Sequence, residues 1–183
     1  MKIKSLGILT AATIALGATS ANANMLFDIY AGGTFGIGGY SLYDGNDFQS
    51  TASQSYGAVL GMDFPLVRIE LEYNYLNKDK INLNYGFVNV YFKLPTPIVK
   101  PYIGGGLGVN SFSKYKPNDA TEIDIDDAVA YQGMLGLTFD IPVIPFNIDV
   151  EGRILYTPDM IEFANEKYDF LQYEGRVKLR YVF

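Results

Sequence analysis

The stretch that decides the fold is YDFLQYEGRVKLRYVF, residues 168–183, at the end of the chain. After Tyr168, Asp169 and Phe170, residue type alternates from one position to the next, beginning at Leu171. One parity holds Leu171, Tyr173, Gly175, Val177, Leu179, Tyr181 and Phe183, and the other holds Gln172, Glu174, Arg176, Lys178 and Arg180. Side chains alternate between the two faces of a strand, so this stretch predicts a strand with one apolar face and one ionic face.

Seven earlier stretches also have the composition of strands, most of them alternating in the same way. A strand that crosses a membrane at a tilt needs about 9–11 residues. The candidates are residues 26–38, 54–64, 67–75, 81–94, 101–112, 129–141 and 146–156. The stretch 81–94 changes parity between Phe87 and Val88, and we expect a β-bulge near Gly86 and Phe87 to restore one continuous apolar face.

The connections between these stretches are of two kinds. Three are short and contain proline, at 64–66, 94–98 and 141–145, which is typical of tight turns. Four are polar and mostly longer, at 41–53, 76–80, 113–128 and 157–167. This asymmetry is typical of outer-membrane barrels. The sequence therefore predicts an all-β fold, an eight-stranded antiparallel up-and-down transmembrane β-barrel, with the tight turns and both termini towards the periplasm.

The charges decide which face of the strands points inward. Ten charged residues share the polar parity: Arg68, Glu70, Glu72, Asp149, Glu151, Arg153, Glu174, Arg176, Lys178 and Arg180. A cation facing lipid at mid-bilayer costs about 2–4 kcal/mol, so reversing the five cations would cost on the order of 10–20 kcal/mol. Five positive and five negative charges inside a narrow barrel predict an interior filled by ion pairs rather than an open channel.

The beginning of the chain has the pattern of a secretory leader. Lys2 and Lys4 precede an apolar run at 6–18, and Ala21-Asn22-Ala23 matches a signal-peptidase site. This run is shorter than the about 20 residues of a spanning helix. We expect residues 1–23 to be a cleaved signal peptide and residues 24–183 to form one barrel domain.

Composition excludes several classes of function. The chain has no cysteine and no histidine, which removes thiol catalysis, histidine-based catalysis and Cys/His zinc sites. Its net charge of −6 argues against a nucleic-acid partner. The supply of 15 tyrosines and 12 phenylalanines suits the aromatic girdles of a membrane barrel.

Three groups of residues leave an alternative open. Glu70, Glu72, Glu151 and Glu174 are favoured as partners of interior cations, and an acid/base pair is the alternative. The glycine runs at 32–33 and 104–106 are favoured as close strand contacts, because no Lys-Ser/Thr pair or helix follows them. The acidic residues Asp119, Glu122, Asp124, Asp126 and Asp127 are favoured as a solvated loop, with a divalent cation as the alternative. No catalytic, cofactor-binding or metal-binding residue is predicted.

Four segments resemble the small outer-membrane barrels of the opacity-protein, OmpX/Ail and OmpA-barrel group. They are Ile29-Tyr30-Ala31-Gly32-Gly33, Asn89-Val90-Tyr91-Phe92, the run from Pro101 to Gly108, and the terminal Leu179-Arg180-Tyr181-Val182-Phe183. The resemblance implies a monomeric protein in the outer membrane of a Gram-negative cell, in contact with lipid and lipopolysaccharide. It also implies that barrel-assembly machinery recognises Tyr181 and Phe183, and that the outer loops contact a host or envelope partner. The short loop at 76–80 departs from the pattern of an adhesin that uses all four loops.

These observations rank four functions. The first is a non-catalytic surface barrel that acts in adhesion or envelope integrity through its loops. The second is a narrow porin-like channel for ions or small solutes, lined in part by glycine. A soluble lipocalin-like carrier would need apolar residues inside, and a lipid-modifying enzyme lacks histidine.

Overall fold

A computed structural model of the chain describes residues 27–43, 49–78, 81–110, 114–115, 123–124, 128–141, 143–163 and 166–183. Eight long strands make up almost all of the described chain. They are β1 (Asp28–Tyr43), β2 (Gln49–Asp63), β3 (Val67–Lys78), β4 (Ile81–Lys93), β5 (Val99–Asn110), β8 (Val129–Asp140), β9 (Phe146–Phe163) and β10 (Glu166–Val182). Two short strands, β6 (Lys114–Tyr115) and β7 (Ile123–Asp124), form a small hairpin.

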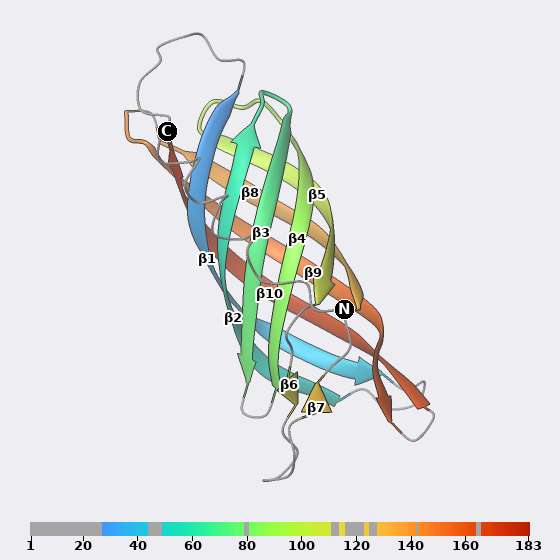
Figure 1. The fold of residues 1–183 in the computed structure, drawn as a ribbon. Coiled ribbons are helices and arrows are strands. Elements are labelled where there is room, and N and C mark those ends of the chain that lie inside the picture. The colour runs from blue at the N-terminus through green and yellow to red at the C-terminus, as the bar shows by residue number, and fades with distance from the viewer. Residues whose placement is uncertain are drawn as a thin grey trace.

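The eight long strands close into a barrel in which every pair is antiparallel. Consecutive long strands pair with each other, and β1 pairs with β10 to join the two ends of the sheet. The β6–β7 hairpin extends the edge of β4 at one end of the barrel (Figure 1). Within the described residues, no helix is long and apolar enough to cross a membrane. The predicted eight-stranded antiparallel barrel is confirmed.

The two ends of the barrel differ. At the turn end, β2–β3, β4–β5 and β8–β9 are joined by the three proline-containing connections, and β1 begins where β10 finishes (Figure 1). Backbone hydrogen bonds tie this end together: the Phe183 amide donates to the Ile29 carbonyl at 2.9 Å, and the Val182 amide donates to the Pro145 carbonyl at 2.8 Å. The opposite end, which carries the polar connections and the β6–β7 hairpin, is called the loop end below.

Five of the eight long strands, β1, β2, β3, β9 and β10, are longer than the sequence pattern predicted. They contain 12 to 18 residues, and much of the polar stretches predicted as loops at 41–53 and 157–167 continues as paired strand. Tyr43 pairs with Asp169, and Lys167 with Glu162. Loss of apolar alternation marks where an apolar environment ends, whereas backbone pairing continues beyond it. The register of β9 and β10 shifts between Tyr168 and Phe170, as at a β-bulge. Asp169 lies at this shift and accepts a hydrogen bond from the outward-facing Tyr156 at 2.7 Å.

The prediction of a β-bulge in β4 is wrong. Register with β3 is continuous from Lys78–Ile81 to Val67–Phe92, and register with β5 is continuous as well. Leu83, Tyr85 and Phe87 therefore point into the barrel on the same face as Asn89 and Tyr91. The physical reason is that the interior at the loop end is apolar, so a parity change in residue type does not require a change of face.

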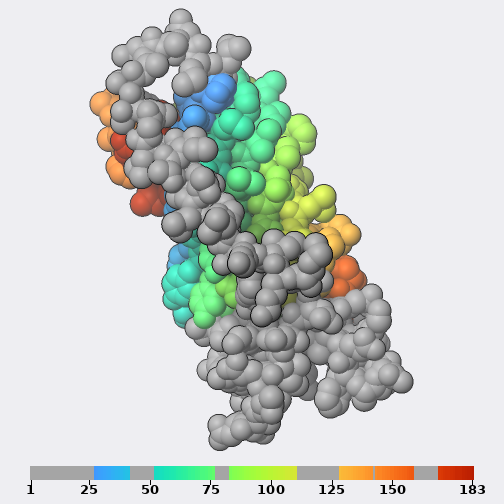
Figure 2. Space-filling model, viewed as in Figure 1, coloured from blue at the N-terminus to red at the C-terminus, as the bar shows by residue number. Residues whose placement is uncertain are grey.

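Elsewhere the two faces are arranged as predicted. Large apolar side chains of every long strand are exposed on the outside, among them Ile37, Leu71, Phe92, Ile103, Leu135 and Ile154. All ten charged residues assigned to the interior are at most 5% exposed. Where the wall is uncovered in the space-filling view, it runs without a break from β1 across β4 to β5 (Figure 2). The barrel is inside-out relative to a water-soluble protein.

Candidate functional site

The interior of the barrel is the only place in the described chain where many polar side chains meet, and it is built in layers. Nearest the turn end, Asp149 on β9 binds two arginines. Arg180 contacts both of its oxygens, at 2.9 and 3.0 Å, and Arg68 contacts Oδ2 at 3.0 Å. Arg68 also donates to the Thr138 hydroxyl at 3.0 Å. Bidentate arginine–carboxylate geometry of this kind fixes orientation as well as charge.

The second layer combines one lysine, two carboxylates and three tyrosine hydroxyls. Lys178 Nζ lies 2.7 Å from Glu70, which also accepts hydrogen bonds from Tyr30 at 2.7 Å and Tyr91 at 2.9 Å. Tyr102 donates to Glu151 at 2.9 Å. The same tyrosine rings pack against Arg68, whose guanidinium carbon lies 5.3 to 5.8 Å from three ring centroids. Charge, hydrogen bonds and ring faces therefore satisfy this layer together.

The third layer is the most highly charged. Arg153 and Arg176 share Glu72, at 3.1 and 2.8 Å, and they share Glu174, at 2.7 and 3.1 Å. Uncharged polar side chains in the same layer donate to these carboxylates, among them Asn89, Gln172 and Ser55. Each carboxylate faces two cations, which is the arrangement that makes buried charges tolerable.

An apolar layer closes the interior towards the loop end. It consists of seven buried side chains from five strands: Leu76, Leu83, Tyr85, Phe87, Ala130, Leu155 and Phe170, with Tyr40 packed against them. We call this cluster the apolar cap. The apolar cap lies between the ionic layers and the loop end of the barrel. A water-filled pore would need polar groups at this level of the interior, and the cap supplies apolar ones.

Inward-facing glycines let the side chains of these layers fit. A Cβ atom on Gly104 would collide with the ring of Tyr91, one on Gly106 with the amide of Asn89, and one on Gly136 with the ring of Tyr102. These glycines lie in strands β5 and β8 and belong to no phosphate-binding loop. Within the 104–106 run, Gly104 and Gly106 are therefore sites of close packing against side chains of β4, and a Cβ atom on Gly105 would make only an ordinary contact, with the Gln132 carbonyl at 3.9 Å.

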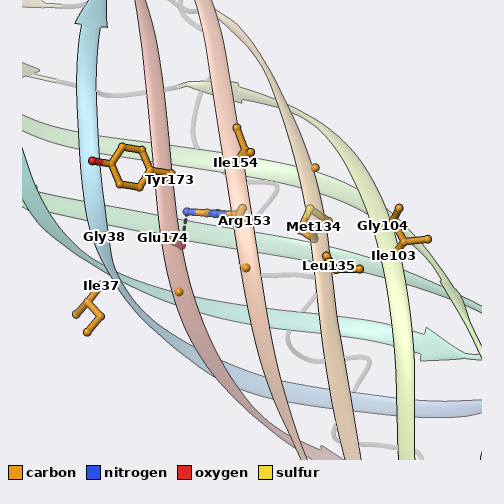
Figure 3. A pocket seen from close by; sticks show the side chains of 13 residues that line it. Ile37, Gly38, Ile103, Gly104, Met134, Leu135, Arg153, Ile154, Tyr173 and Glu174 are labelled. Carbon is orange, nitrogen blue, oxygen red and sulfur yellow. Dashed lines mark ion pairs between the residues drawn. The ribbon is translucent and has the colours of Figure 1, made fainter. Parts of the chain in front are cut away.

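The outside of the wall carries one shallow groove of about 660 Å³. Its lining includes Gly133, Gly152 and Gly175. The large side chains around it are apolar or aromatic, namely Ile37, Ile103, Leu135, Ile154 and Tyr173 (Figure 3). The lining also includes Arg153 and Glu174, which pair with each other inside the barrel. The groove therefore offers shape and a mostly apolar surface, and the charges of Arg153 and Glu174 are used in their mutual ion pair.

The structure brings together most of the residues that the sequence singled out. Glu70, Glu72, Glu151 and Glu174 are all buried and all lie within 4 Å of a lysine or arginine. This is the ion-pairing role favoured for them over an acid/base pair. The described residues contain no group of three or more potential metal ligands. Asp119, Glu122, Asp126 and Asp127 lie outside the described residues, and of that loop only Asp124 falls within a strand, β7.

Two parts of the interior were not predicted. One is the apolar cap, because apolar residues such as Leu83 and Phe87 were assigned to the outside. The other is the set of interior tyrosines, Tyr30, Tyr91 and Tyr102, which bond to the carboxylates. Their parity was the available signal, since each shares the face of the charged residues on its strand.

Comparison with known proteins shows which solved structures share this fold. No protein-family model matches the chain, and no curated protein matches its sequence. Neisserial surface protein A (NspA) superposes with a TM-score of 0.62 at 14% identity, covering 82% of this chain and 95% of that one. The N-terminal β-barrel domain of Pseudomonas aeruginosa OprF gives a TM-score of 0.51 at 13% identity, covering 83% and 97%. The chain has the fold of small eight-stranded outer-membrane barrels, as the resemblance implied.

Proposed function

We propose that this chain is a non-catalytic integral protein of the outer membrane of a Gram-negative cell, and that it acts through the loop end of its barrel. The observation that carries this proposal is the inverted wall. Leu135 is 67% exposed and Ile103 61% exposed on the outside, while Arg68, Lys178 and Arg180 are fully buried inside. This distribution is unfavourable in water and favourable against acyl chains.

The expected route to the membrane fits this proposal. Residues 1–23, which lie outside the described residues, would direct export and be removed. Tyr181 and Phe183 would then present the end of β10 to the barrel-assembly machinery. Both side chains are exposed, and their rings pack edge to face at 5.2 Å. In this topology the turn end faces the periplasm and the loop end faces outward.

The role we assign is structural and interactive: envelope integrity and adhesion, with lipopolysaccharide and a host or envelope protein as partners of the outer loops. The filled interior supports a role on the surface over a role in transport. Three ionic layers and the apolar cap occupy the interior of the barrel. The interior carboxylates are engaged in ion pairs with lysine and arginine. The outward-facing loop end is the part of the molecule left to contact partners. We expect the protein to act as a monomer.

Two measurements test this proposal. The first is fractionation of cells that make the full chain, with heat-modified electrophoresis, because a folded membrane barrel changes mobility on boiling. The second is digestion of intact cells with external protease, which should cut the loops and spare the turns. Recovery of a correctly folded protein from the aqueous fraction without detergent would overturn the membrane placement.

The second candidate function is a narrow channel for ions or small solutes, which the interior glycines suggested, although the space over Gly104 and Gly106 is filled by Tyr91 and Asn89. Planar-bilayer recording of the refolded protein separates the two functions. A filled interior predicts no stable openings. Reproducible ion-selective openings would favour the channel and contradict the structural role.

A further inference from the structure

The three tight connections at the turn end are unusually apolar. They are residues 64–66, 94–98 and 141–145, and we call them the apolar turns. They contain five prolines, no charged residue and one polar residue, Thr96. Their aliphatic side chains are exposed: Leu66 by 56%, Leu94 by 60%, and Val143 completely. Turns that project into water are normally built from glycine, asparagine, aspartate and serine.

The backbone of these turns is suited to an environment without water. Five of their residues are prolines, which have no amide hydrogen to satisfy. Several of the remaining amides are bonded within the protein: Phe64 to the Val67 carbonyl at 2.8 Å, Leu94 to Pro101 at 2.9 Å, and Thr96 to Leu94 at 2.9 Å. The Thr96 hydroxyl, the one polar side chain, donates to the Val99 carbonyl. A polar backbone group in an apolar layer is costly unless it is bonded in this way.

A ring of tyrosines marks the other limit of the apolar wall. Five outward-facing tyrosines are between 40% and 53% exposed: Tyr56, Tyr73, Tyr131, Tyr156 and Tyr173. We call them the tyrosine girdle. The hydroxyls of Tyr56 and Tyr156 donate to Gln54 and Asp169, which lie nearer the loop end along their strands. Tyrosine at a membrane–water boundary keeps its ring in the apolar layer and its hydroxyl in the polar one.

The length of wall between this girdle and the turns is short. The girdle residues stand six to ten positions from the turn end of their strands, for example Tyr56 from Asp63 and Tyr156 from Phe146. At about 3.3 Å per residue and a tilt of about 40°, this corresponds to roughly 15–25 Å along the barrel axis. The apolar band of an outer-membrane barrel is about 25 Å tall. On most sides the strands alone therefore fall short of it.

We propose that the apolar turns complete this band, and that they are seated in the phospholipid leaflet at the turn end rather than projecting into the aqueous phase. The occupant of this surface is lipid: the glycerol region and the upper acyl chains. The exposed residues of the turns continue the outer wall without interruption, since Phe92 leads into Leu94 and Ile144 leads into Phe146. Val143 supports the same placement. Its apolar side chain is fully exposed, which is costly in water and favourable against lipid. The inference rests on the proposed membrane placement.

The chain has no cysteine, so single cysteines can be labelled cleanly. Four variants are refolded into phosphatidylcholine vesicles and labelled with a small environment-sensitive fluorophore. Val143→Cys and Leu66→Cys report on two different turns. Leu135→Cys reports on the middle of the wall, and Ala52→Cys reports on the loop end beyond the girdle. Quenching is measured with iodide on both sides of the vesicle, and separately with a lipid that carries a nitroxide near the carbonyl end of its acyl chain.

If the turns lie in the leaflet, iodide quenching at Val143 and Leu66 is about fivefold lower than at Ala52, because iodide is excluded from the apolar layer, and the lipid nitroxide quenches both turn labels strongly. Turn labels as open to iodide as Ala52, beside a protected Leu135 label, overturn the inference and leave the membrane placement intact. Turn labels protected from both quenchers indicate a second copy of the chain as the occupant, and also overturn it. A Leu135 label open to iodide defeats the membrane placement itself, and the inference with it.

Discussion

Glu72 shows how a single residue holds the interior together. Its two oxygens accept from Arg176 at 2.8 Å, Arg153 at 3.1 Å and Asn89 at 2.8 Å, and its side chain is fully buried. If the charge of Glu72 were removed, Arg153 and Arg176 would remain in a low-dielectric interior and would share only Glu174. The cost of an ion pair broken in this way comes mainly from the charges that remain.

We therefore expect Glu72→Gln to lower the free energy of unfolding by about 3–5 kcal/mol, as is typical when one partner of a buried ion pair is removed. The measurement is urea unfolding of the refolded barrel in lipid vesicles. Lys100→Gln is the matched control, because it breaks a pair with Asp140 that is 28% and 32% exposed, and such pairs contribute about 1 kcal/mol or less. Equal losses in the two variants would contradict this account of the interior.

Glycines on the two faces of the wall should respond differently to the same change. Gly104→Ala places a methyl group against the buried ring of Tyr91 and should cost about 1–3 kcal/mol, as overpacking does. Gly133→Ala on the neighbouring strand meets nothing within 4 Å, and should be neutral or stabilising by up to about 1 kcal/mol. The same urea titration compares them. A larger loss at Gly133 would mean that its groove packs against something in the assembled membrane.

At the scale of elements, β4 offers the sharpest test of the structure. Phe87 points into the apolar cap, and Val88 points outward with 53% exposure. The chain has no tryptophan, so Phe87→Trp and Val88→Trp each introduce a single fluorophore. Bromine atoms on the acyl chains should quench the Val88→Trp variant and leave the Phe87→Trp variant bright. A bulge near Gly86 would turn both side chains to the lipid, and both would then be quenched.

Alternation predicted the strands well where the two environments differ most. On β3, β9 and β10 the inside is ionic and the outside apolar, so side-chain type alone reported the face of Glu70, Arg153 and Lys178. On β4 both environments are apolar near the loop end, and the pattern carried no information about Leu83 and Phe87. The ends of β1 and β9 were missed for a related reason. Strand pairing there continues through polar residues. Backbone hydrogen bonds do not depend on side-chain type, so the sequence shows no alternation at these positions.

The candidate site was predictable in composition and not in geometry. Five cations and five anions of one parity implied ion pairs. Arg153 and Glu174 face each other on the adjacent strands β9 and β10. The sequence could not show that Arg153 and Arg176 also share Glu72, because β3 meets these strands only across the closed barrel. Tyr30, Tyr91 and Tyr102 were missed as ligands of the carboxylates, because tyrosine is equally common on the outside of such a barrel.

At the scale of the whole molecule, the distance between the tyrosine girdle and the apolar turns sets a preferred membrane. We expect the free energy of unfolding to be greatest in bilayers with a hydrocarbon thickness of about 25 Å. It should fall by fractions of a kcal/mol for each ångström by which the bilayer is thicker than this. Unfolding in phosphatidylcholine vesicles of increasing chain length measures this dependence. Stability that rises steadily with thickness would contradict the assigned limits of the apolar wall.

The pairing of β1 with β10 has a consequence for biogenesis. Fourteen successive residue pairs, from Tyr30–Val182 to Tyr43–Asp169, join the first strand to the last. This seam cannot form until synthesis has passed β10, so both margins of the sheet stay open in the nascent polypeptide until then. A premature stop before β10 would remove the partner of two strands at once, and the remaining sheet would present two bare edges to proteases and to other chains.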